Sequence, residues 1–149
     1  SQKAIDELMK SMRSELVNEQ EDIIRAALEG KGVLSDQKTI PLLITALASS
    51  QISYQFEQTY NIIFGSQLQL LNSLNESQGF NRTVSHSLYQ LAASQYPDFY
   101  KTYSFDQWLG YLLNVGLILD QTGQLVITVR GREFLAYLIH RGLSMNKWY

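Results

Sequence analysis

The hydrophobic period of the sequence changes along the chain, and this change limits the folds that are available to it. In the first half, apolar residues recur every three or four positions, which places them on one face of a helix. Near the end, residues 117–119 and 125–129 are aliphatic or β-branched, and turn-forming residues separate them. We therefore expect a mainly α-helical protein, with long N-terminal helices and a two-stranded β-hairpin close to its end.

The first apolar stripe runs from Ile5 to Leu28, and Gly30 is suited to end a helix of this length. A polar run at residues 19–22 interrupts the stripe and indicates a kink or a polar layer. The pattern leaves open whether this segment forms one helical rod or two.

A second helical segment is expected to begin between residues 35 and 40. The pair Ser35-Asp36 offers an N-cap, and Pro41 is tolerated only in or near the first turn of a helix. Beyond this start, apolar residues keep a period near 3.6 residues, the α-helical value, for several further turns.

This second periodic segment is too long for one helix of a compact domain. If it ran unbroken to Asn75, it would be about 50 Å long at ~1.5 Å per residue, longer than the body of a domain of this size. We expect a break or bend at Gly65 and a new helix from Ser66. The chain is accordingly divided into a helical arm, residues 1–65, and a C-terminal domain, residues 66–149.

The C-terminal domain shows a clear order of predicted elements. They are a loop at 76–83, a helix at 84–94, an irregular aromatic-rich connection at 95–103, a helix at 105–114, a hairpin at 117–129 and a final helix. Ser104 and Thr128 are suitable N-caps for the last two helices, and Gly142 is suited to end the final one.

Two stretches carry a resemblance to a known family. One is Asn114-Val115-Gly116-Leu117-Ile118, and the other runs from Leu125 to Leu135 as LVITVRGREFL. A Gly-Leu-Ile step leading into a hairpin, and a Thr-x-x-Gly-x-x-Phe-Leu pattern leading out of it, resemble the winged-helix (winged helix-turn-helix) family. The resemblance covers about residues 66–142 and implies a C-terminal winged-helix unit. Residues 1–65 resemble no family.

The winged-helix resemblance implies a binding role, often the recognition of DNA by the third helix in the major groove. The residues that would then contact nucleic acid are Gln107, Tyr111 and Asn114 at the bases and Arg130 and Arg132 at the phosphates.

The charge pattern weakens the DNA interpretation. The presumed reading helix, residues 105–114, contains no Lys or Arg and carries Asp106 near its start. Affinity for DNA depends mainly on the neutralisation of phosphates, so binding through this helix is expected to be electrostatically weak. Residues 1–100 contain 7 Lys and Arg against 11 Asp and Glu, whereas residues 101–149 contain 5 against 3.

Composition favours a protein partner over a polyanion. Charged residues make up 17% of the chain, below the ~25% typical of soluble domains, and the formal net charge is -2. A weakly charged polar surface favours self-association over long-range steering. We expect a homodimer, or association with another protein, through apolar positions of the N-terminal helices. These positions are Ile5, Leu8, Met12, Leu16, Ile23, Leu47, Ile52 and Phe56.

No recognisable catalytic centre is present in the sequence. His86 and His140 have no Asp or Glu at helical metal-pair spacing, and residues 30–32 lack the Ser or Thr of a phosphate-binding loop. The chain contains no cysteine, which excludes disulfides and thiolate metal sites. We expect no enzymatic activity, no cofactor and no metal.

The remaining features bear on location and on aromatic packing. No apolar stretch approaches the ~20 residues that span a bilayer, so we expect a cytoplasmic protein without a membrane partner. The aromatic residues between Tyr89 and Tyr111 are expected to fill the core, with a partly exposed patch for a protein partner as the alternative. Trp148 and Tyr149 are expected to dock on the helical arm or on a second copy.

The leading functional hypothesis is a non-enzymatic regulatory or adaptor module that binds protein partners, chiefly itself. The alternative is a DNA-binding transcriptional regulator of the winged-helix type.

Overall fold

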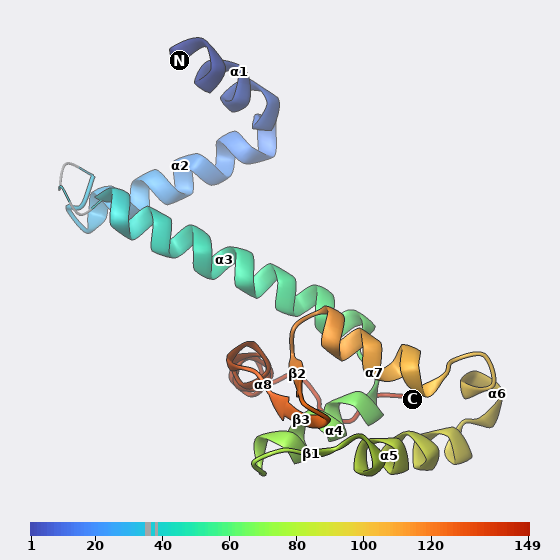
Figure 1. The fold of residues 1–149 in the computed structure, drawn as a ribbon. Coiled ribbons are helices and arrows are strands. Elements are labelled where there is room, and N and C mark those ends of the chain that lie inside the picture. Colours follow the sequence, from blue (N-terminus) through green and yellow to red (C-terminus); the bar gives the residue numbers. More distant parts are fainter. Residues whose placement is uncertain (35–36, 38) are drawn as a thin grey trace. The chain divides into compact units, whose positions relative to one another are not determined.

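The computed structural model describes residues 1–34, 37 and 39–149, and it is mainly helical (Figure 1). These residues form eight α-helices and one small antiparallel sheet. They divide into two compact units, Ser1–Ser50 and Gln51–Tyr149, and helix α3 (Thr39–Ile62) contributes residues to both. The predicted N-cap at Ser35-Asp36 lies outside the described residues.

The N-terminal unit begins with two helices, α1 (Gln2–Met12) and α2 (Glu15–Gly30). The break between them lies at Arg13-Ser14, because the Ser14 side chain accepts a hydrogen bond from the Val17 N–H and so starts a new helix. The polar run at residues 19–22 remains helical within α2. The structure therefore shows two helices, and the kink or polar layer indicated at 19–22 does not divide them.

No described residue of the N-terminal unit is buried. Helix α2 and the first half of α3 share a recess of about 200 Å³, lined by Glu21, Ile24, Arg25, Leu28, Leu34 and Leu43. The two helices therefore share a seam between them without enclosing a core.

The C-terminal unit contains the second half of α3 and all the later elements. In chain order these are α4 (Gly65–Asn75), β1 (Phe80–Asn81), α5 (Arg82–Gln95), α6 (Pro97–Tyr100), α7 (Phe105–Asn114), β2 (Ile118–Gln121), β3 (Gln124–Ile127) and α8 (Val129–Arg141). The break near Gly65, the helix at 105–114, the hairpin and the final helix are confirmed.

The hairpin turn and the start of α8 form for local reasons. Thr122 and Gly123 both have positive φ angles. A two-residue turn of this kind matches the right-handed twist of the two strands that it joins. The Thr128 hydroxyl accepts from the Gly131 N–H and caps α8, and Gly142 ends that helix in the left-handed conformation.

Two short elements within the C-terminal unit differ from the prediction. Residues Phe80–Asn81, expected in a loop, form strand β1, which pairs with β3 and gives the sheet order β1-β3-β2. The segment 95–103 contains the one-turn helix α6, with Pro97 at its first position. Neither element is long enough to produce a hydrophobic period in the sequence.

The core of the C-terminal unit surrounds α4 and α7. Trp108, Leu109 and Leu112 of α7 are fully buried, as are four leucines of α4. Polar groups of α4 inside the core are hydrogen-bonded. The Ser66 hydroxyl accepts a hydrogen bond from Trp108 Nε1 at 2.9 Å, and Gln67 Nε2 donates to the Trp108 carbonyl at 2.8 Å. These bonds hold α4 against α7, and they thereby position α7, which carries three of the predicted contact residues.

Gly131 permits the close approach of α8 to the segment that leads into β2. A Cβ atom at Gly131 would lie 2.2 Å from the Leu117 carbonyl oxygen. We expect Gly131→Ala to lower the free energy of unfolding by about 2 kcal/mol or more in urea titrations, because a rigid core must shift. Gly110→Ala is the control, since a Cβ at Gly110 of α7 meets nothing within 4 Å. This change should raise stability by about 0.5–1 kcal/mol. Equal effects of the two changes would contradict the packing described.

Candidate binding surfaces

The three residues predicted to read bases lie on α7 and have different surroundings. Gln107 is exposed, but its Oε1 accepts a hydrogen bond from the Ser104 N–H at 2.9 Å and completes the capping box. Tyr111 is half-buried, and its hydroxyl donates to the Thr59 carbonyl of α3 at 3.4 Å. Asn114 is exposed. Only Asn114 has a side chain for which no hydrogen bond is found within the described residues.

The two predicted phosphate contacts also differ. Arg130 donates to Gln55 Oε1 at 2.7 Å, and its guanidinium carbon lies 5.3 Å from the centre of the Phe56 ring. These contacts hold Arg130 against α3. Arg132 is exposed on α8.

Tyr111 and Arg130 meet at a groove between α3, α7 and α8. The groove has a volume of about 340 Å³, and α3 contributes Gln55, Gln58, Thr59 and Ile62 to its lining. The structure therefore brings two of the five predicted contacts together at a groove that is partly formed by α3. Gln107, Asn114 and Arg132 remain on the exposed surface.

An ion-pair cluster at the start of α7 changes the local charge. Arg82, the first residue of α5, lies 3.7 Å from Asp106 of α7 and 3.3 Å from Asp120 of β2. Arg82 is thus paired with two carboxylates beside the start of α7. Sequence reasoning missed Arg82 in this role because the cation lies far from both carboxylates along the chain.

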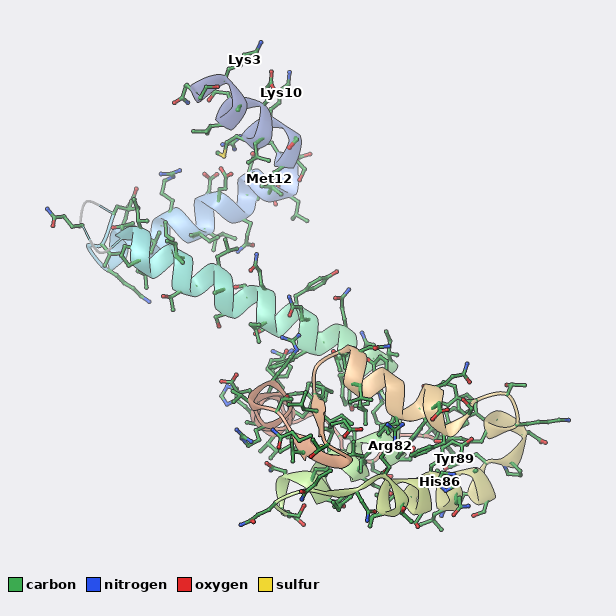
Figure 2. The ribbon with its side chains drawn as sticks, viewed as in Figure 1. Lys3, Lys10, Met12, Arg82, His86 and Tyr89 are labelled. Atoms are coloured by element: carbon green, nitrogen blue, oxygen red, sulfur yellow. The ribbon has the colours of Figure 1, made fainter. Side chains whose placement is uncertain are left out.

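The aromatic residues of α5 and α7 fill space between these helices. Arg82, His86 and Tyr89 follow one another along α5 (Figure 2). The Tyr89 ring lies 5.7 Å from the rings of both Phe105 and Trp108, and the His86 ring lies 4.6 Å from that of Phe105. These edge-to-face contacts support the interpretation of core filling.

Seven of the eight predicted dimer-interface residues have exposed side chains. They are Ile5, Leu8, Met12, Leu16, Ile23, Leu47 and Ile52. Phe56 differs, because only 3% of it is exposed and its ring packs 5.4 Å from those of Phe134 and Tyr137. Phe56 belongs to the core of the C-terminal unit and is not available to a partner.

The first half of α3 carries an apolar surface that is wider than a single stripe. The sequence has no charged residue between Lys38 and Glu57. Leu42, Leu43 and Ile44 are consecutive and exposed, and consecutive residues point about 100° apart around a helix. A helix that is apolar on several sides is normally buried on several sides. The lack of charge was the signal in the sequence that could have revealed this surface.

Trp148 and Tyr149 dock within the C-terminal unit of their own chain. Their carbonyl oxygens accept hydrogen bonds from the first amides of α4, at Gly65 and Ser66. The Tyr149 ring stacks on that of Phe99. The structure places them against Phe64 and Gly65, at the end of the predicted helical arm, and against α4 and α6 of the C-terminal unit.

Comparisons with known proteins identify no relative. The sequence matches no family model, and no similar curated protein or solved structure is found.

The described residues contain no group of three or more His, Cys, Asp or Glu side chains that could hold a metal ion. Among the helices formed by residues 1–34, 37 and 39–149, none is long and apolar enough to cross a membrane.

Three tyrosines, one buried and two half-buried, make the free energy of unfolding depend on pH in the alkaline range. Burial raises the pKa of Tyr111 above 10.0, against the opposing effect of its hydrogen bond to Thr59, and burial likewise raises the pKa of Tyr100 and Tyr103. The folded protein then holds these protons more tightly than the unfolded chain. The contribution of these tyrosines to the free energy of unfolding is complete below pH 10.0, and it is lost as the pH rises through their raised pKa values.

We expect the free energy of unfolding to fall as the pH rises above 10.0, and Tyr111→Phe to make this fall shallower. Urea titrations at a series of alkaline pH values measure the slope. An unchanged slope in the variant would show that Tyr111 does not contribute.

Proposed function

We propose that this chain is a non-enzymatic regulatory or adaptor module that acts by binding protein, and that its principal partner is a second copy of itself. The observation that carries the proposal is the N-terminal unit, in which two helices and the first half of a third bury no described residue. Helices of this length are marginal in water unless an apolar face is packed. A partner that covers these faces would supply the missing core.

The helical hairpin of α2 and α3 suits pairing with itself. Its seam is open and partly apolar, and two such hairpins related by a two-fold axis would enclose both seams as a four-helix bundle. In a two-fold interface the same patch contributes both sides, so apolar residues of one copy meet those of the other.

The charges beside the apolar stripe also favour a second copy over a strongly charged partner. Residues 1–34 contain five Lys and Arg and seven Asp and Glu, distributed along the same helices. Lys3 and Lys10 lie on the same side of α1 (Figure 2). In the sequence, Asp6 and Glu7 come between these two lysines. Mixed signs of this kind can be matched by an identical surface, but they select neither a polyanion nor a polycation.

For the C-terminal unit we propose a winged-helix type of arrangement. The order of helices, the hairpin that follows α7 and the sheet order β1-β3-β2 support it. We propose that this unit serves protein binding, because α7 lacks a cation and Arg82 is paired with two carboxylates. DNA binding is the second candidate, and the exposure of Asn114 and Arg132 favours it.

A charge placed in the apolar stripe tests self-association. Leu16 and Leu47 are 73% and 61% exposed in the chain, so Leu16→Glu and Leu47→Glu should leave the fold intact. Each should raise the dimer Kd at least about thirtyfold in sedimentation equilibrium, because loss of a central apolar contact costs about 2 kcal/mol or more.

Ile139→Glu is the matched control, since Ile139 is 75% exposed on α8 in the C-terminal unit. It should leave the dimer Kd unchanged. A monomeric unaltered chain, or an equal effect of the control, would overturn the proposal.

The DNA candidate is tested by fluorescence anisotropy with mixed-sequence duplexes at low salt. We expect no saturable binding, because α7 contains no Lys or Arg and therefore cannot neutralise DNA phosphates. Binding that weakens steeply with salt, and that Arg132→Ala and Asn114→Ala each reduce, would instead establish the DNA-binding function.

A further inference from the structure

The segment Asn146–Tyr149, here called the tail segment, crosses the start of α4. The Gly65 N–H donates to the Trp148 carbonyl at 3.1 Å, and the Ser66 N–H donates to the Tyr149 carbonyl at 2.9 Å. The first amides of a helix have no acceptor within the helix itself. The tail segment therefore supplies acceptors that α4 requires, and it does so through its backbone, as a peptide ligand would.

The start of α4 is shaped for a peptide backbone. A Cβ atom on Gly65 would lie 2.1 Å from the Lys147 carbonyl oxygen. Only glycine at this position allows the tail segment to come close enough for its hydrogen bonds. The first position of an ordinary helix carries no such restriction on side-chain size.

Aromatic rings hold the side chains of the tail segment. The Tyr149 ring is stacked on Phe99, with ring centres 3.9 Å apart and planes 13° from parallel, and it lies 5.2 Å from the Tyr96 ring. The Lys147 ammonium lies 4.3 Å from the centre of the Tyr60 ring and also donates to the Tyr60 carbonyl. One aromatic and one cationic side chain are thus recognised, two residues apart.

The tail segment only partly fills its surroundings. Trp148 is 75% exposed, although it stands between the two residues that make the closest contacts. Recesses of about 160 Å³ and 300 Å³ adjoin Tyr149, the first beside Gly65 and Ser66 and the second beside Pro97 and Phe99. A surface segment in which Asn146, Trp148 and Tyr149 are exposed can open at a lower free energy than the whole unit.

We infer that the start of α4, together with the rings of Tyr60, Tyr96 and Phe99, is a peptide-binding site that the tail segment occupies in cis. The ligand class is an extended peptide with a lysine two residues before an aromatic residue, the pattern of Lys147 and Tyr149. Release of the tail segment opens the site to such a peptide from a partner protein. The inference goes beyond the proposed function, because it does not depend on self-association.

The test uses the full chain and an amidated peptide with the sequence of residues 143–149, labelled with a fluorophore at its N-terminus. The double variant Lys147→Ala/Tyr149→Ala removes the side chains that anchor the tail segment and leaves the site unchanged. It should bind the peptide at least about tenfold more tightly than the unaltered chain, because a tethered occupant competes at an effective concentration of roughly millimolar.

Two controls define the site. Adding Gly65→Ala to the double variant should abolish peptide binding, since the new Cβ would occupy the position of the peptide carbonyl. A peptide in which the lysine and the tyrosine are both replaced by alanine should not bind. Equal affinity for the double variant with and without Gly65→Ala, or no binding by a folded double variant, would overturn the inference.

A second measurement does not depend on a variant that folds. The chain contains two tryptophans, Trp108 and Trp148, so a chain labelled with 5-fluorotryptophan gives two fluorine resonances. Excess unlabelled peptide should move the Trp148 resonance to the position that it has in the free peptide. A Trp148 resonance that stays fixed under saturating peptide would show that the tail segment is a permanent part of the fold.

Discussion

The packing of Phe56 against Phe134 and Tyr137 is the contact that decides what the rest of the chain can do. It fixes the second half of α3 in the C-terminal unit, where Glu57 also accepts a hydrogen bond from Tyr137 and pairs with Arg141. For the first half of the same helix, no aromatic pair or ion pair is found within the described residues, and its large apolar side chains are exposed. One helix therefore contributes to a packed core along its second half and carries exposed apolar residues along its first half, and the exposed half is the basis of the proposed function.

The same packing engages residues that a DNA-reading surface would use. Tyr111 and Arg130, which a reading surface would need, are engaged with α3, and Arg82 is paired with Asp106 and Asp120. Arg82 and Arg130 are therefore used within the fold, whereas Arg132 is exposed. A surface that binds protein by shape and apolar contact needs no cationic helix. Protein binding of this kind is consistent with the low net charge of the chain.

Features governed by local chemistry could be predicted from the sequence. Ser104 and Thr128 cap their helices as expected, and the hairpin forms around Gly123. Features that depend on distant partners could not be predicted. The apolar stripe of α3 continues through Phe56, and nothing in the local sequence indicates that Phe56 is buried whereas the apolar residues before it are exposed. The ion pairs of Arg82 join residues that are far apart in the sequence. Strand β1 has only two residues, too few for a periodic pattern.

Hydrogen exchange at several protein concentrations shows whether association gives the N-terminal unit its core. If association supplies the core of the N-terminal unit, amide protection in α1 and α2 should rise with protein concentration, while protection in α4 should stay constant. Protection in α2 that is equally strong in dilute monomer would contradict the account, because the unit would then be stable without a partner.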